Sequence, residues 1–89
     1  MLTPQLPTRF KRDRRLVENR GKDIAKLREL MTLLLGGQPL PAHYRDHALH
    51  GNWAGFREAH IEPDWLLARR TWRDELQFAR TGTHADIFG

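Results

Sequence analysis

The chain has 89 residues, enough for one domain with a single modest core, and we expect one domain over residues 1–89. It contains no cysteine, which excludes disulfides and thiolate metal sites, and its apolar runs are far too short to span a membrane. The first segment, MLTPQLPTRF, lacks the apolar centre of a signal peptide, so we expect a cytoplasmic protein.

The formal net charge is +4, and the excess is uneven along the chain. Residues 1–45 carry ten Lys and Arg against four Asp and Glu, whereas residues 46–89 carry five against seven. A basic first half suggests a surface that faces a polyanion, such as RNA, DNA or an acidic protein. A solvated basic helix without a ligand would give the same charge pattern.

The first half predicts two helices after an extended segment. LTPQLP contains two prolines, which is typical of an extended lead-in or an edge strand. Residues 8–20 favour a helix that Thr8 caps and Gly21 ends. Asp23 can cap a second helix, which GGQPLP ends. That helix has one apolar stripe: Ile24, Leu27, Leu30, Met31 and Leu34.

The second half predicts antiparallel strands. GFREAHIE alternates between two faces, with Phe56, Glu58 and His60 on one of them. DWLLAR is an apolar run typical of a central strand, and ELQFART alternates again after a turn in RTWRD. AHYRDH is a further short extended candidate. Two helices followed by several strands indicate an α+β domain with the helices on one face of the sheet.

Titratable side chains gather beside these strand ends and turns: His47, His50, His60, Asp64, Arg80 and His84. Loops and strand ends are where a rigid scaffold presents groups to a substrate. The three or four ligands of a zinc site could come from His47 and His50, with His60 or His84 and Asp64. No HExxH motif or finger-like spacing selects such a set, however, so we expect no metal and no cofactor.

The same side chains fit metal-independent cleavage of RNA by its own ribose 2′-hydroxyl. That reaction needs a base, an acid for the 5′-oxygen that leaves, and a cation for the charge on the phosphorane. Histidine suits the first two roles and arginine the third. His60, Asp64, Arg80 and His84 supply every part, although ordinary surface polar groups could show the same spacing.

Two longer motifs carry a resemblance to a known family. The stretch LMTLLLGGQPLPAHYRDHALHGNWAGFREAHIEPDWLLAR, with ARTGTHADIFG after it, resembles the YafQ toxins of bacterial type II toxin–antitoxin systems, within the RelE/ParE superfamily. The likeness runs from about Gly21 to Gly89 and continues more weakly through the first helix. It implies a RelE-like, microbial-RNase-like fold, in which two N-terminal helices pack on a twisted antiparallel sheet.

The resemblance implies a ribosome-dependent mRNA endonuclease that cleaves mRNA in the A site of the 70S ribosome and inhibits translation. It also implies neutralisation by an acidic antitoxin of the DinJ/RelB type in a hetero-oligomeric complex. The family's functional positions fall on seven residues of this chain: His47, His60, Asp64, Trp65, Arg80, His84 and Phe88.

The chemistry of the side chains suggests roles for these positions. His84 is the expected general acid, and His60 with Asp64 forms the base side, although His60 and His84 could exchange roles. Arg80 would stabilise the phosphorane, and Phe88 would position His84 or stack on a base. His47 would assist the base or contact the phosphate.

Several further positions carry expectations. The KRDRR run is by default a solvated helix face, but the resemblance favours contact with ribosomal RNA through Lys11, Arg12, Arg14 and Arg15. Trp65 is expected to pack or to join this RNA contact, Trp53 to lie in the core, and Trp72 to be exposed. Ala68 and Arg69 stand where relatives tend to have a bulky aliphatic residue and an aromatic one, so Arg69 is expected to change a substrate contact or local packing.

Two other classes of function stay open at this point. The basic helix pair could make the chain a non-catalytic module that binds nucleic acid or an acidic protein. A gyrase-directed, ParE-like toxin could use the same scaffold. The histidines of the second half argue against both.

Overall fold

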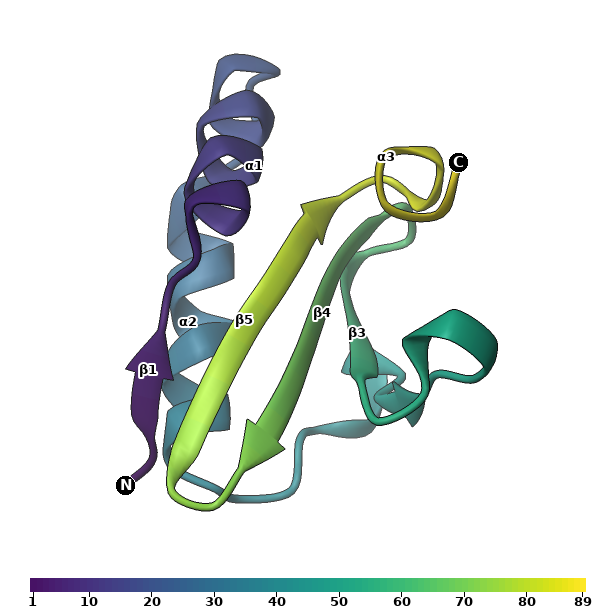
Figure 1. Ribbon diagram of the computed structural model, residues 1–89. Coiled ribbons are helices and arrows are strands. Elements are labelled where there is room, and N and C mark those ends of the chain that lie inside the picture. The colour runs from purple at the N-terminus through teal and green to yellow at the C-terminus, as the bar shows by residue number, and fades with distance from the viewer.

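Three α-helices and five strands make up the fold, and the computed structural model describes all residues from 1 to 89. The helices are α1 (Thr8–Asn19), α2 (Ile24–Leu35) and α3 (His84–Phe88). The strands are β1 (Thr3–Gln5), β2 (His47–Ala48), β3 (Arg57–Glu62), β4 (Trp65–Trp72) and β5 (Glu75–Gly82) (Figure 1). Two short 3₁₀ turns, η1 (Ala42–Tyr44) and η2 (Gly51–Trp53), flank β2.

The strands form one sheet in the order β1-β5-β4-β3-β2. The pairs among β2, β3, β4 and β5 are antiparallel, whereas β1 runs parallel to β5. The α+β prediction is therefore confirmed, but the sheet is mixed rather than wholly antiparallel. Pro4 lies in β1, where an edge strand tolerates the missing amide donor.

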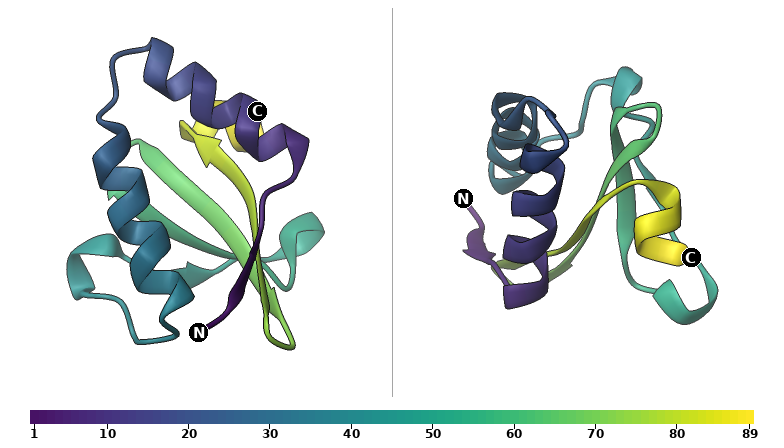
Figure 2. Two further views of the ribbon diagram at one scale, coloured as in Figure 1. Left: turned by 90° about the vertical axis from the view of Figure 1, so that its left-hand side faces the viewer. Right: turned by 90° about the horizontal axis from the view of Figure 1, so that it is seen from above.

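Helices α1 and α2 cover one face of the sheet, and α3 lies on the other (Figure 2). The core between helices and sheet is apolar, with Phe10 of α1 packed on Phe78 of β5 at 5.8 Å between ring centroids. Its other members include Val17, Leu27, Leu30, Leu34, Ala59, Leu67 and Leu76. No helix is long and apolar enough to cross a membrane. We call the face opposite α1 and α2 the open face of the sheet.

The helix boundaries follow the expected signals with one exception. Asp23 caps α2, since its Oδ1 accepts a hydrogen bond from the Ala25 amide at 3.0 Å. Gly21 has a φ of 92° after the end of α1, a left-handed conformation that glycine adopts without strain. The prediction that Thr8 caps α1 is wrong: Pro7 holds that position, and its ring has no group that can cap.

The strand predictions also differ in detail. AHYRDH is only partly extended, because the η1 turn precedes β2. Trp72 belongs to β4 rather than to the turn, which lies at Arg73 with a φ of 59°. Trp72 is 65% exposed, as expected.

The burial of Trp65 contradicts the expectation that it contacts RNA. Its side chain is 1% exposed and belongs to the core between the sheet and the helices. Its indole Nε1 donates a hydrogen bond to the Thr81 hydroxyl at 3.0 Å, and this hydroxyl donates to the Leu66 carbonyl at 2.8 Å. Trp65 therefore ties the start of β4 to the end of β5, and its indole does not face solvent.

Replacing Thr81 with Val should destabilise the protein. The substitution keeps the shape but leaves the buried indole N–H without an acceptor, at a cost of about 1–3 kcal/mol in the free energy of unfolding. Urea denaturation measures this loss. The control is Thr71→Val, because Thr71 is an exposed residue of β4. Its free energy of unfolding should change by less than about 0.5 kcal/mol. Equal stability of the two variants would contradict the role assigned to Trp65.

Candidate active site

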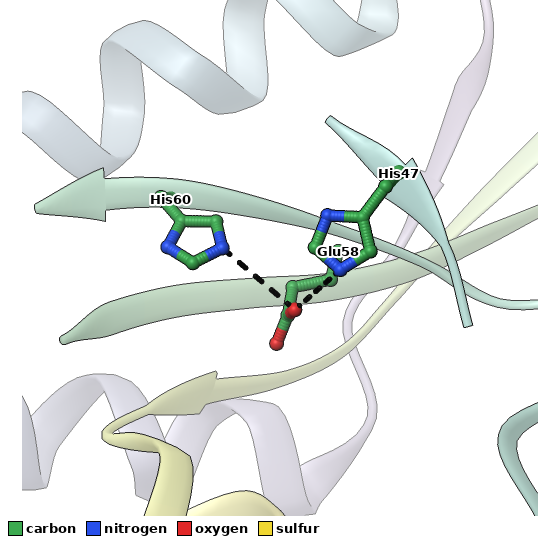
Figure 3. Close-up of side chains that lie close together, drawn as sticks. All are labelled: His47, Glu58 and His60. Atoms are coloured by element: carbon green, nitrogen blue, oxygen red, sulfur yellow. Dashed lines mark ion pairs between the residues drawn. The ribbon is translucent and has the colours of Figure 1, made fainter. Parts of the chain in front are cut away.

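Two histidines and a glutamate meet on the open face (Figure 3). The pairing of β2 with β3 sets His47 opposite Glu58, and His60 follows two residues later on the same face of β3. The Nε2 atom of His47 lies 2.9 Å from Glu58 Oε2, and that of His60 lies 3.8 Å from the same oxygen. The two rings are 5.8 Å apart and Glu58 lies between them. We call these three residues the histidine–glutamate cluster.

Backbone carbonyls orient both rings. Nδ1 of His47 is 2.8 Å from the Arg45 carbonyl oxygen, and Nδ1 of His60 is 3.4 Å from that of Pro63. A carbonyl oxygen only accepts, so each Nδ1 must carry a proton to make its bond. Each Nε2 is thereby directed at the carboxylate. The 2.9 Å contact between His47 and Glu58 is an ion pair when His47 is protonated.

Glu58 is the functional candidate that sequence reasoning missed. It is 3% exposed, and its Oε1 atom is buried without a hydrogen-bond partner. Leaving a buried polar group unpaired costs about 1–3 kcal/mol, and more when it is charged, so such groups call for an explanation. The alternation in GFREAHIE predicted that Glu58 and His60 share one face of a strand, and it was the one sequence signal that pointed to Glu58. The sequence did not predict that Glu58 is buried.

A second ion pair holds the segment before His47. Arg69, in β4, is 5% exposed and places Nη2 2.8 Å from Asp46 Oδ1. Burial lowers the pKa of the Arg69 guanidinium, and the hydrogen bond to Asp46 opposes this shift. Arg57 adds a contact to the same carboxylate oxygen at 3.3 Å. Arg69 thus acts on local packing, one of the two effects expected for it, and fixes the residue next to His47.

Arg80 does not lie free in solvent. Its Nε and Nη2 atoms donate to the carboxylate of Asp13 in α1 at 2.6 and 3.3 Å, and Nη2 also donates to the Asp86 carbonyl at 3.1 Å. Asp13 is 5% exposed and also accepts from the Thr81 amide. Arg80 therefore connects α1, β5 and α3, and of its three guanidinium nitrogens only Nη1 is outside these bonds.

The terminal segment TGTHADIFG is a capped helix. The Thr83 hydroxyl accepts from the Asp86 amide at 3.0 Å, while the Asp86 carboxylate accepts from the Thr83 amide at 2.9 Å. This reciprocal pair satisfies two amides that the start of α3 would otherwise leave free. Asp64 Oδ1 accepts from the His84 amide at 2.9 Å. Asp64 therefore holds His84 in place, and the carboxylate beside His60 is Glu58.

Asp86 also ties α3 to the end of α1. Arg20 donates to its carboxylate at 2.6 and 3.2 Å. These bonds, followed by those from Thr83, hold the pKa of Asp86 far below its usual range. A Cβ on Gly82 would lie 2.8 Å from Asp86 Oδ2, so only glycine lets β5 pass this close to the helix.

Aromatic rings continue from α3 over the open face. His84 and Phe88 lie 4.8 Å apart, and Phe88 lies 5.5 Å from Trp53. Trp53 in turn meets Phe56 at 5.0 Å. The prediction that Trp53 lies in the core is wrong: it is half-buried in η2, outside the core cluster, and its ring contacts Phe88 of α3.

The predicted site residues fall into three groups. His47 and His60 meet at Glu58, while Asp64, His84 and Phe88 meet at α3. The basic residues of α1 lie on the other side of the sheet, with Arg14 half-buried and the others exposed: Lys11, Arg12 and Arg15. Any RNA contact through α1 is therefore separate from the catalytic face.

The histidine–glutamate cluster could also hold a metal ion. One ligand atom from each of its three residues lies within 4.8 Å of the others. Two imidazoles and a carboxylate suit zinc or copper. The set differs from the one considered from sequence, since Glu58 takes the place of His50, His84 and Asp64.

Comparison with known proteins places the chain in a family. A family model described as "Bacterial toxin of type II toxin-antitoxin system, YafQ" matches residues 2–89. The chain belongs to the YafQ family. The mRNA interferase toxin YafQ of Escherichia coli K12 is 51% identical over 81 residues, which cover 90% of this chain and 88% of that protein.

Solved YafQ-family structures share the fold. The E. coli DinJ–YafQ complex contains a chain that matches with a TM-score of 0.93 at 46% identity, with full coverage of both chains. A metal-bound toxin from Helicobacter pylori matches with a TM-score of 0.92 at 33% identity, covering 99% of this chain and 100% of that one. The α+β fold therefore belongs to the family.

The depressed pKa of Asp86 predicts a loss of stability in acid. Its pKa is lower in the folded than in the unfolded chain, so its contribution is complete above the unfolded value of about 3.9 and declines as the pH falls below it. Thermal unfolding of the protein and of Asp86→Asn should differ most near neutral pH and converge below about pH 4. A difference that stays constant down to pH 2 would contradict this role.

Proposed function

We propose that this YafQ-family toxin is an endoribonuclease that cleaves mRNA in the ribosomal A site by metal-independent acid–base catalysis. The observation that carries the proposal is the buried Glu58 carboxylate, which faces the Nε2 atoms of His47 and His60. The 51% sequence identity to an mRNA interferase toxin supports mRNA as the substrate. The products would be a 2′,3′-cyclic or 3′-phosphate and a 5′-hydroxyl.

The histidine–glutamate cluster is the base side of the proposed reaction. His60 Nε2 takes the proton of the ribose 2′-hydroxyl, and Glu58, 3.8 Å away, stabilises the imidazolium that forms. His47 faces the same carboxylate oxygen at 2.9 Å and assists the base side. Glu58 replaces Asp64 as the carboxylate on this side, since Asp64 is bound to the His84 amide.

Helix α3 supplies the acid side. His84 is exposed on its first turn, with its ring against Phe88, and donates a proton to the leaving 5′-oxygen. Arg80 binds the Asp86 carbonyl of this helix and directs its remaining Nη1 to the charge that develops on the phosphorane. The two sides act on one phosphate, as cleavage through the 2′-hydroxyl requires.

Two macromolecular partners complete the proposal. The exposed basic residues of α1 contact ribosomal RNA and position the toxin without reading sequence: Lys11, Arg12 and Arg15. An acidic antitoxin of the DinJ type neutralises the toxin in a hetero-oligomeric complex. The DinJ–YafQ complex of E. coli supports this partner class.

His84→Ala should abolish growth inhibition while the variant still folds and binds its antitoxin. Loss of a general acid lowers the cleavage rate by about 10²–10⁴-fold. Primer extension of an mRNA in a cell-free translation reaction measures the rate, and thermal unfolding checks the fold. The matched control is His43→Ala, an exposed histidine of η1 outside the site, which should cleave normally. Full activity of His84→Ala would refute the role of α3.

Removing transition metals should leave cleavage unchanged. Toxin dialysed against EDTA, then tested in the magnesium buffer that ribosomes need, should cut at the untreated rate, because side chains supply both proton transfers. Added copper or zinc should inhibit, since it would occupy the histidine–glutamate cluster and remove the base. Loss of activity in EDTA with recovery on adding zinc would contradict a metal-independent reaction.

A further inference from the structure

The open face extends well beyond the catalytic residues. Strand pairing sets Ala68 of β4 opposite Glu58, and Arg70 and Trp72 follow at alternate positions on β4. Alternate residues of a strand share a face, so Arg70 and Trp72 lie on the face that carries the histidine–glutamate cluster. A strand rises about 3.3 Å per residue, which puts Trp72 about 13 Å along β4 from Ala68.

A continuous series of edge-on and tilted aromatic contacts joins α3 to Arg70. The contacts of His84, Phe88, Trp53 and Phe56 lead to the edge of β3, as described above. The Arg70 guanidinium then lies 4.9 Å from the centre of the Phe56 ring. Its Nε donates to Gln77 Oε1 at 2.8 Å, which fixes its plane and leaves both terminal nitrogens for an anion.

Arg70 also lines one end of an open cavity of about 660 Å³ between β1 and the β4–β5 hairpin. Trp72 forms part of its wall together with Gln5, Gln77 and Glu75. Trp72 is 65% exposed, and Arg73 stands 5.6 Å from its ring. A tryptophan this exposed, on a polar sheet face, is available to stack on a flat ligand.

We propose that this cavity is a subsite for single-stranded mRNA, which holds a base a few nucleotides from the cut. The base stacks on Trp72, and the neighbouring phosphate binds Arg70. Exposed aromatics beside arginines on a sheet are the usual platform for unpaired bases. The inference rests on the proposed function, because it takes the mRNA to cross the open face.

Charge decides which part of the nucleotide enters the cavity. Glu75, opposite Trp72 in the strand pairing, would repel a phosphate there but accepts hydrogen bonds from a neutral base. Arg70, one step closer to the cluster, carries the positive charge that a phosphate needs. The order along β4 is therefore cluster, phosphate site, base site.

The test compares Trp72→Ala and Trp72→Phe with the unmodified toxin on ribosome-bound mRNA. Stacking is worth about 1–3 kcal/mol per base, so Trp72→Ala should lower kcat/KM by about 5- to 150-fold. Trp72→Phe should keep most of the activity, since it keeps a stacking ring. Thermal unfolding should not change in either variant, because the side chain is exposed. Antitoxin affinity should not change either, since the proposal assigns Trp72 to mRNA.

Abasic mRNAs make the test specific to one contact. A single abasic nucleotide is placed at successive positions on both sides of the cut. At one position the abasic nucleotide should slow cleavage by the unmodified toxin as much as Trp72→Ala slows cleavage of normal mRNA. At that position it should not slow cleavage by the Trp72→Ala variant any further. Additive effects at every position would overturn the subsite.

The remaining outcomes separate this inference from the proposed function. An unmodified toxin that cuts no mRNA refutes the proposed function, and the subsite with it. Full cleavage by Trp72→Ala refutes the subsite alone. Full cleavage with weakened antitoxin binding would show that the antitoxin covers Trp72, which also overturns the proposal.

Discussion

The geometry of the proposed catalytic face depends on the hydrogen bonds that the buried Asp13 carboxylate accepts. It lies in α1, on the helix side of the sheet, yet it binds the Arg80 side chain and the Thr81 amide at the end of β5. Arg80 connects this contact to α3 through the Asp86 carbonyl, and Arg20, directly after α1, holds the Asp86 side chain. The helix layer thereby fixes the terminal helix on the opposite face, and a chain end that could fray becomes a rigid part of the site.

The histidine–glutamate cluster on β2 and β3 differs from Asp13, because its carboxylate lacks part of its hydrogen bonds. Glu58 keeps one buried oxygen without a partner and directs the other at two imidazoles. This arrangement costs folding free energy, and in the proposed reaction it places negative charge where an imidazolium forms during proton transfer. The ion pair of Asp46 with Arg69 holds the segment beside it. Asp13 and Asp46 thus stabilise the fold around the site, and Glu58 supplies the carboxylate of the proposed base side.

The sequence predicted the elements well because periodicity and capping are local. The apolar stripe of α2, the Asp23 cap and the alternation of β3 each needed only neighbouring residues. What it could not predict came from contacts between distant segments. Burial of Trp65 and Glu58 depends on how the sheet meets the helices and on the β2–β3 pairing, and the contact of Trp53 with α3 depends on η2. The pairing of Asp13 with Arg80, 67 residues apart, has no local signature.

The central claim is that the histidine–glutamate cluster and His84 together cut mRNA held by the ribosome. Mapping mRNA 5′-ends after brief expression tests it most directly, with the unmodified toxin beside Glu58→Gln, which removes the charge and keeps the shape. The account predicts new 5′-hydroxyl ends in phase with codons for the unmodified toxin and their near-complete loss in the folded variant. Equal numbers of phased ends from both proteins would contradict it.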